Sequence, residues 1–125
     1  MFCRWSAAWV YGVAGVPAII EFISDIYVHP FKDHRQLHYR NYQLNFDRDL
    51  FWRVGETAVV SPEQCVAELL VHDGSPAAVV AAAALLRGTE EIRSKKLDRA
   101  MRACDTIGQA KARNRALAQL DSWRR

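Results

Sequence analysis

The sequence predicts a mainly α-helical fold, a small bundle of antiparallel helices over residues 62–72, 76–87 and 90–121. Half of the 125 residues are apolar and a quarter are charged, which is typical of a globular chain rather than a disordered one. Helix start and stop signals recur from residue 61 onward, separated by short connections. The length fits a single domain, 1–125. We expect three consecutive parts in it: an apolar N-terminal segment (1–28), an irregular aromatic connector (29–60), and a helical part with a basic C-terminal helix (61–125).

The N-terminal segment contains an uncharged run from Trp5 to Ile20. Sixteen residues of helix span about 24 Å, which is less than the ~30 Å hydrocarbon core of a membrane. The length favours a buried element, a strand over Ala8–Val13 followed by an amphipathic helix that starts at Pro17. Two alternatives stay open. One is a membrane anchor, with membrane contact through residues 5–28. The other is a signal peptide, although the run lacks a convincing cleavage site.

Aromatic and basic side chains are interspersed in the middle part, and they show no sustained period of two or of 3.6 residues. We expect an irregular connector, with a short helix around His34 and a strand near Tyr42–Phe46. His34 and His38 have the spacing of two metal ligands on one helix face. Arg35 stands where a zinc protease carries its glutamate, and a cation there opposes metal binding. We therefore predict no metal site.

Local helix start and stop signals divide the helical part into separate helices. Two serine–proline pairs and one threonine mark helix starts, and two glycines mark helix ends. These residues are Ser61-Pro62, Ser75-Pro76 and Thr89 for the starts, and Gly74 and Gly88 for the ends. The second helix is nearly all alanine and valine, so we expect it to be central and buried on most sides. The apolar stripe of the third helix shifts after Gly108, which predicts a bend or a break there.

Charge and cysteine content narrow the class of protein. From Arg87 to Arg125 there are 11 lysines and arginines against 5 acidic residues, a net charge of +6. Such a segment suits an acidic protein face, a nucleic-acid backbone or an anionic membrane, or it is simply a solvated helix face. The cysteines, Cys3, Cys65 and Cys104, are odd in number and widely spaced. They indicate buried thiols in a reducing, intracellular compartment, with membrane or organellar association left open.

The sequence contains no phosphate-binding loop, no nucleophile elbow and no dinucleotide fingerprint. We therefore predict no enzymatic activity, no cofactor and no small-molecule substrate. Aromatic residues of the N-terminal segment and an apolar line flanked by arginine near the C-terminus are typical of partner contacts. The candidate contact residues are Trp5, Trp9, Tyr11, Arg113, Arg115, Leu117, Leu120, Trp123 and Arg124. Trp123 has an equal alternative, in which it folds back onto the core of its own domain.

These observations predict a non-catalytic structural or accessory subunit of a larger protein assembly, either membrane-associated or not, that acts through protein–protein contacts. The first alternative is an RNA-associated or other nucleic-acid-associated protein that uses the basic C-terminal helix. Its binding would weaken steeply as salt rises, whereas apolar docking would respond little. A further alternative is a small regulator or inhibitor of a partner protein.

Overall fold

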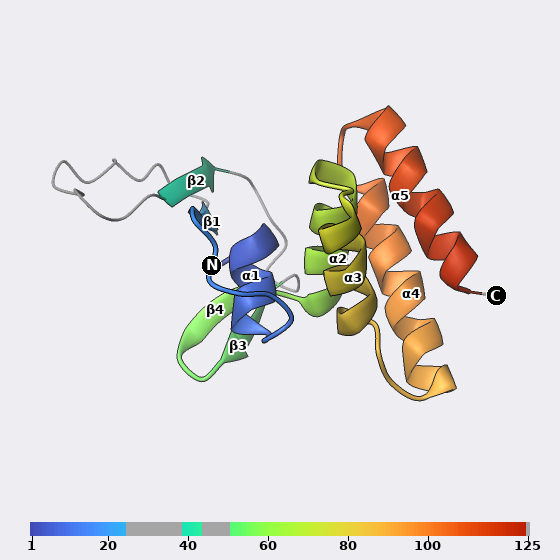
Figure 1. Ribbon diagram of the computed structural model, residues 1–125, viewed down its shortest axis with the longest axis horizontal. Helices are drawn as coiled ribbons and strands as arrows, with labels where there is room; N and C mark the ends of the chain where they lie inside the picture. The colour runs from blue at the N-terminus through green and yellow to red at the C-terminus, as the bar shows by residue number, and fades with distance from the viewer. Residues whose placement is uncertain (25–38, 44–50, 125) are drawn as a thin grey trace, which may run out of the picture. The chain divides into compact units, whose positions relative to one another are not determined.

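The computed structural model describes residues 1–24, 39–43 and 51–124 (Figure 1). The chain divides into two compact units, an N-terminal unit (Met1–Ser61) and a helical unit (Pro62–Arg125), and each is described by itself. The described residues contain five helices and two small sheets. The fold is therefore mixed α/β, and the prediction of a mainly α-helical bundle is wrong. The prediction of a single domain stays a prediction.

The N-terminal unit contains one helix and four strands among its described residues. In chain order they are α1 (Arg4–Val10), β1 (Ile20–Ser24), β2 (Tyr39–Gln43), β3 (Phe51–Val54) and β4 (Thr57–Val60). Strands β1 and β2 pair in parallel, with Ile20 opposite Tyr39 and Ser24 opposite Gln43. Strands β3 and β4 form an antiparallel hairpin. Helix α1 packs against β1 and β4 and buries Ser6, Ala7 and Ala8.

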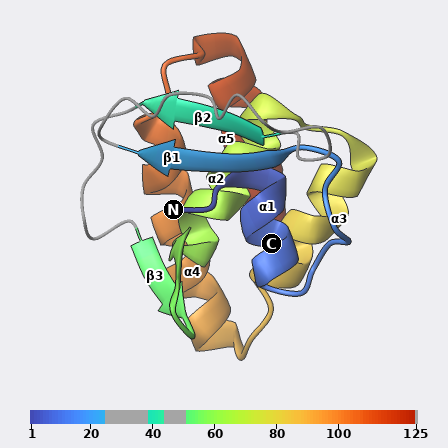
Figure 2. The same cartoon turned by 90° about the vertical axis from the view of Figure 1, so that its left-hand side faces the viewer.

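The residues before α1 connect the two sheets. Phe2 forms an antiparallel bridge with Phe22 of β1 and a parallel bridge with Val59 of β4. Its N–H donates to the carbonyl oxygen of Ala58 at 2.9 Å, and its own carbonyl oxygen accepts from the N–H of Val60 at 2.9 Å. Figure 2 shows the N-terminus between β1 and β4. On the other side, the N–H of Cys3 donates to the carbonyl oxygen of Glu21 at 3.1 Å and the carbonyl oxygen of Met1 accepts from the N–H of Ile23 at 2.8 Å, so residues 1–3 together satisfy backbone groups of both β1 and β4.

The order of elements predicted for the N-terminal segment is the reverse of the order observed. The expected strand over Ala8–Val13 is the end of α1 and the turn that follows, and the expected helix from Pro17 gives way to β1. The apolar spacing of Ile19, Phe22 and Ile23 suggested a helix. However, these residues enter a strand because β2, whose pairing partners lie 19 positions away, supplies the hydrogen bonds.

The middle part is not an irregular connector, because it contains β2, β3 and β4. The β3–β4 hairpin has a two-residue loop that begins with Gly55, whose φ is +62°. A two-residue hairpin loop needs a positive φ at its first position, and glycine adopts this value without steric cost. Glycine between two short apolar runs was a local signal for this hairpin. The helix expected around His34 and the end of the strand expected at residues 44–46 lie outside the described residues.

The helical unit follows its local signals closely. Its helices are α2 (Pro62–His72), α3 (Pro76–Leu85), α4 (Glu90–Asp105) and α5 (Ala110–Trp123). The Oγ of Ser75 accepts from the N–H of Ala78 at 3.2 Å, and the Oγ1 of Thr89 accepts from the N–H of Ile92 at 3.3 Å. The helix predicted over 90–121 is two helices, and the expected break lies near Gly108.

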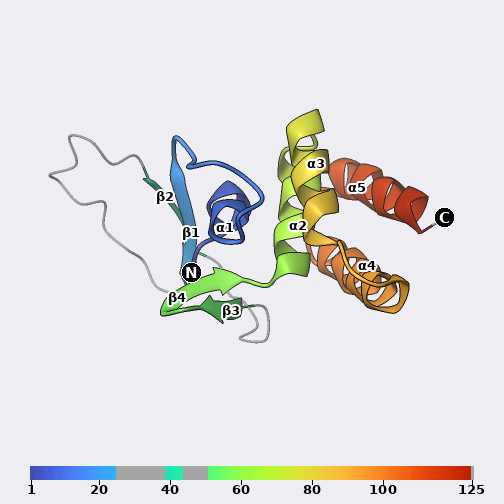
Figure 3. The ribbon, with the colours of Figure 1, turned by 60° about the horizontal axis from the view of Figure 1, so that its bottom comes forward.

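Helix α2 is the centre of the helical unit, since it packs against α3, α4 and α5. Figure 3 shows the α2–α3 pair crossing the α4–α5 pair. The fully buried side chains of this unit include Val66, Leu69, Leu70, Leu97, Cys104 and Leu120. The prediction that the second helix is central is wrong. Helix α3 packs mainly on α2, and its other side is exposed.

Candidate functional site

The N-terminal candidates lie on or just after α1. Trp5 is half-buried, and Trp9, one helical turn further on the same face, is 38% exposed. Tyr11 is half-buried, and its hydroxyl donates to the carbonyl oxygen of Val60 at 2.7 Å. Tyr11 therefore joins the residue after α1 to β4, whereas Trp5 and Trp9 have indole surface that reaches solvent.

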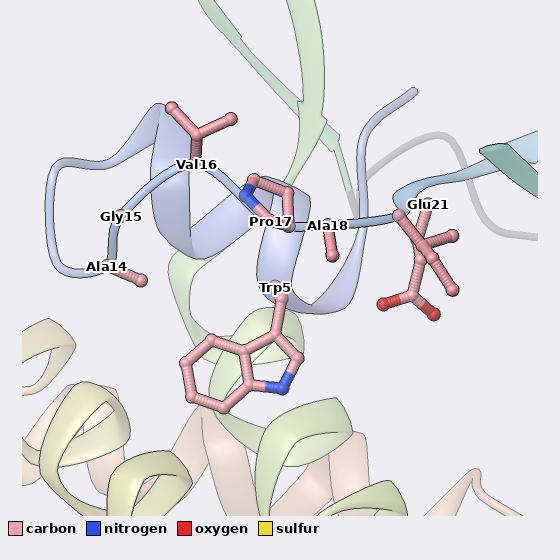
Figure 4. A pocket seen from close by; sticks show the side chains of 8 residues that line it. Trp5, Ala14, Gly15, Val16, Pro17, Ala18 and Glu21 are labelled. Carbon is pink, nitrogen blue, oxygen red and sulfur yellow. The ribbon is translucent and has the colours of Figure 1, made fainter. Parts of the chain in front are cut away.

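Trp5 lines an open hollow of about 430 Å³ between α1 and the loop that leads to β1. In Figure 4 the loop passes over the indole of Trp5, Val16 points away from the indole, and Glu21 lies at one end. Val16 is 73% exposed and Ile19 is 39% exposed. We call Trp5, Trp9, Val16 and Ile19 the N-terminal apolar surface. The hollow is lined by Trp5, Ala14, Gly15, Val16, Pro17, Ala18, Ile19 and Glu21.

A polar cluster formed by Arg4, Glu21 and Tyr42 lies at the Glu21 end of the hollow. Nη1 of Arg4 donates to the Tyr42 hydroxyl at 2.8 Å, and that hydroxyl donates to Oε2 of Glu21 at 2.7 Å. Nη1 of Arg4 also lies 3.6 Å from Oε2 of Glu21, and the guanidinium lies 4.0 Å from the centroid of the Tyr42 ring. Arg4 therefore balances the charge of the carboxylate.

The backbone of Arg4 is strained, because its φ is +50° and it is not a glycine. Burial raises the pKa of Tyr42, and the hydrogen bond that its hydroxyl donates to Glu21 raises it further. Tyr42 thus stays protonated at neutral pH and is suited to holding Glu21 rather than to attacking a substrate. Sequence reasoning missed this cluster, since its members lie 17 and 21 positions apart and no local pattern connects them.

The arginines predicted as contacts near the C-terminus form bonds within the helical unit. Nη2 of Arg115 donates to the carbonyl oxygens of Leu70 and Val71 at 3.3 and 3.4 Å, at the C-terminal end of α2. Nη1 of Arg113 donates to the carbonyl oxygen of Ile107 at 3.3 Å. Arg124 forms an ion pair with Asp98. Each arginine thus connects α5 to another part of the unit.

The apolar candidates of α5 contribute to the core to different degrees. Leu120 is fully buried, so it belongs to the core and is not on the surface. Leu117 and Trp123 are half-buried. Exposed surface near the C-terminus is therefore less apolar than the sequence pattern indicated. The roles of Leu117 and Trp123 as partner contacts stay predictions.

Lys96, which lies within α4, likewise binds carbonyl groups at the end of another helix, α3. Nζ of Lys96 donates to the carbonyl oxygens of Leu85 at 3.3 Å and Arg87 at 2.9 Å, where α3 ends. Carbonyl groups in the last turn of a helix have no partner within the helix, and cations stabilise them. Lys96 and Arg115 thus each donate to carbonyl groups at the end of a neighbouring helix of the same unit.

The three cysteines are thiols and all are buried, as expected. Burial raises the pKa of Cys104 to about 11. Among the described residues, no group of three or more histidine, cysteine or acidic side chains is arranged to hold a metal ion. His34 and His38 lie outside the described residues. No helix in the described ranges combines the length and the apolar character needed to cross a membrane.

Comparison of the chain with protein-family models, with curated protein sequences and with solved structures finds no match.

Proposed function

We propose that this chain is a non-catalytic accessory subunit that docks on another protein through its N-terminal apolar surface. The observation that carries the proposal is the exposure of Val16, 73%, beside the Trp5 hollow. The exposed Val16 and Ile19 line this hollow together with Trp5, and exposed apolar groups of this kind are typical of protein interfaces.

The shape of the surface supports a protein partner. Trp5 and Trp9 supply rigid aromatic area, which provides contact at a small cost in side-chain entropy. The hollow accepts an aliphatic or aromatic side chain of the partner, and the neighbouring Glu21 carboxylate is already balanced by Arg4. Apolar burial therefore dominates this docking. Because three of the basic side chains near the C-terminus bond to helix ends or to Asp98, they support the nucleic-acid alternative less well.

Co-purification with a matched pair of variants tests the proposal. The tagged full chain is expressed in its source cells, and the bound proteins are quantified by mass spectrometry after nuclease treatment. V16E places a charge on the proposed surface, and V80E places the same charge at a position of α3 that is 70% exposed. We expect V16E to lose the partner at least about tenfold, which corresponds to about 1.4 kcal/mol of binding free energy, and V80E to retain it.

Two outcomes would contradict this function. Equal retention of the partner by both variants would remove the N-terminal apolar surface as the docking site. Binding that disappears with nuclease, or that weakens steeply with salt, would favour the nucleic-acid alternative. Circular dichroism of both variants shows that a lost partner does not reflect a lost fold.

A further inference from the structure

Helix α3 has an apolar side that no element of the helical unit covers. No residue from Pro76 to Leu86 is polar or charged. The buried residues Ala78, Ala81, Ala82 and Leu85 recur at the spacing of one helix face, which is the face that packs on α2. Figure 1 shows α3 in front of α2, with no other element of the helical unit on its near side. A surface helix that is apolar all round normally has a second partner.

The uncovered side of α3 is centred on Val80, which is 70% exposed. Its other residues lie at equal distances on either side: Ala77 and Ala83 are three positions away, and Pro76 and Ala84 are four positions away. All are exposed except Ala84, which is half-buried. We call these five residues the α3 outer face. A two-fold axis through Val80, perpendicular to the helix, exchanges Ala77 with Ala83 and Pro76 with Ala84, so each residue of this face is exchanged with another small apolar residue.

Opposite charges flank the two ends of α3. Asp73 lies three positions before Pro76 and Arg87 lies two positions after Leu85, and both are exposed. Oδ1 of Asp73 accepts from the N–H of Ser75 at 2.9 Å. In an antiparallel pair of α3 helices, Asp73 of each copy lies at the end that carries Arg87 of the other. The ends are therefore complementary in charge.

We propose that two copies of this chain pair through their α3 outer faces, antiparallel, with the two-fold axis at Val80. The face is self-complementary in shape and charge, which is the property that a two-fold interface requires. The small side chains of this face allow the two helix axes to approach to about 9–10 Å. The contact is small compared with the ~1,200 Å² at the lower end of stable interfaces, so we expect a reversible dimer of micromolar or weaker affinity. The proposal goes beyond the accessory function, because it uses the other unit of the chain.

Sedimentation equilibrium tests whether the dimer forms. The full chain is measured from about 1 µM to about 1 mM, the range in which a weak pair associates. We expect the wild type and V16E to show the same monomer–dimer equilibrium. Glutamate is a better helix former than valine, so V80E keeps α3 folded while it places two like charges on the axis. We expect V80E to weaken the dimer at least about tenfold.

Cysteine cross-linking tests the position of the axis. In V80C, the two introduced thiols face each other across the axis, at the Cα separation of about 4.4–6.8 Å that a disulfide needs. The native cysteines are buried and do not compete. I92C is the control, since Ile92 is 49% exposed but lies on α4. We expect V80C to form a covalent dimer under mild oxidation at least about tenfold faster than I92C does.

A wild-type chain that stays monomeric to about 1 mM would overturn the proposal. So would a dimer that V80E leaves unchanged, or equal cross-linking rates for V80C and I92C. These results are separate from those of the docking experiment. Loss of the partner in V16E concerns the N-terminal apolar surface alone, and loss of the dimer in V80E concerns α3 alone.

Discussion

The guanidinium of Arg115 occupies the space next to Gly74 into which any side chain at that position would extend. A β-carbon on Gly74 would lie 2.5 Å from Nη2 of Arg115 and 2.9 Å from its Cζ. The φ of Gly74 is +69°, a value that other residues rarely adopt. Gly74 therefore ends α2 and also leaves room for the arginine that binds the last carbonyl groups of α2.

The substitution G74A tests this relationship. We expect it to lower the free energy of unfolding by about 1–3 kcal/mol, because alanine is strained at positive φ and its methyl group displaces Arg115. Urea unfolding followed by circular dichroism measures the change. G108A is the control. A β-carbon at position 108 would have no neighbouring atom within 4 Å, and the φ of Gly108 is not positive. A loss of stability in G108A as large as that in G74A would contradict the argument.

The variant R115A shows whether the two residues act together. Alone it should lower the free energy of unfolding by about 1 kcal/mol, as the loss of hydrogen bonds to two carbonyl groups implies. In G74A/R115A the methyl group of the introduced alanine no longer meets a guanidinium. The double variant should therefore lose less stability than the sum of the losses of the two single variants. A double-mutant cycle by urea unfolding measures this coupling. Additive losses would show that the arginine does not depend on the glycine.

The raised pKa of Cys104 predicts a specific dependence of stability on pH. A solvent-exposed cysteine thiol has a pKa of 9.0, whereas the pKa of Cys104 is about 11 in the folded chain. Between these two values the folded state keeps the thiol proton whereas the unfolded state loses it. The stabilisation that comes from the protonated Cys104 is therefore complete below pH 9.0 and decreases as the pH rises to about 11. The difference in free energy of unfolding between the wild type and C104A should shrink across this range. A difference that is constant or that grows would contradict the burial of the thiol.

The variant Y42F tests the polar cluster. Removing the hydroxyl leaves Arg4 and Glu21 without their shared partner, and we expect a loss of about 1 kcal/mol in the free energy of unfolding. The measurement is urea unfolding at neutral pH. The variant Y42F/E21A should lose less than the sum of Y42F and E21A, because the hydrogen bond between these side chains is lost only once. Full additivity would show that the 2.7 Å contact contributes nothing.

The variant R4G addresses the strained backbone at the start of α1. Glycine removes the cost of a φ of +50°, about 1–2 kcal/mol, but it also removes the bond to Tyr42. R4A keeps the strain and loses the same bond. We therefore expect R4G to be more stable than R4A in urea unfolding. The reverse order would contradict the left-handed conformation of Arg4.

Local sequence signals located the helices of the helical unit but did not identify the bonds that its basic side chains form within the unit. Ser75 and Thr89 are N-caps because their hydroxyls bind N–H groups only three positions ahead. Arg113 and Arg115 bind carbonyl groups of their own unit, and their contacts with another molecule stay predictions. A basic residue looks the same in sequence whether it meets solvent, a partner or a helix end 45 positions away.

The candidate surfaces were predicted in part. The N-terminal aromatic residues were identified from composition, and Trp5 and Trp9 do retain exposed area. Val16 and Ile19 were counted within an apolar run and were not recognised as a loop, because the run was divided into the wrong elements. The exposed side of α3 was expected to be buried, since small apolar residues fill a core as readily as they cover a surface.

The sequence by itself determined where α2, α3 and α4 begin and that a break occurs near Gly108, because capping and helix termination depend on neighbours within one turn. Only the tertiary structure decided that Ile20–Ser24 is a strand, that Phe2 joins two sheets, and that α2 rather than α3 is central. The physical reason is the range of the interactions. Strand pairing and burial depend on partners far away along the chain, and the local pattern does not identify them.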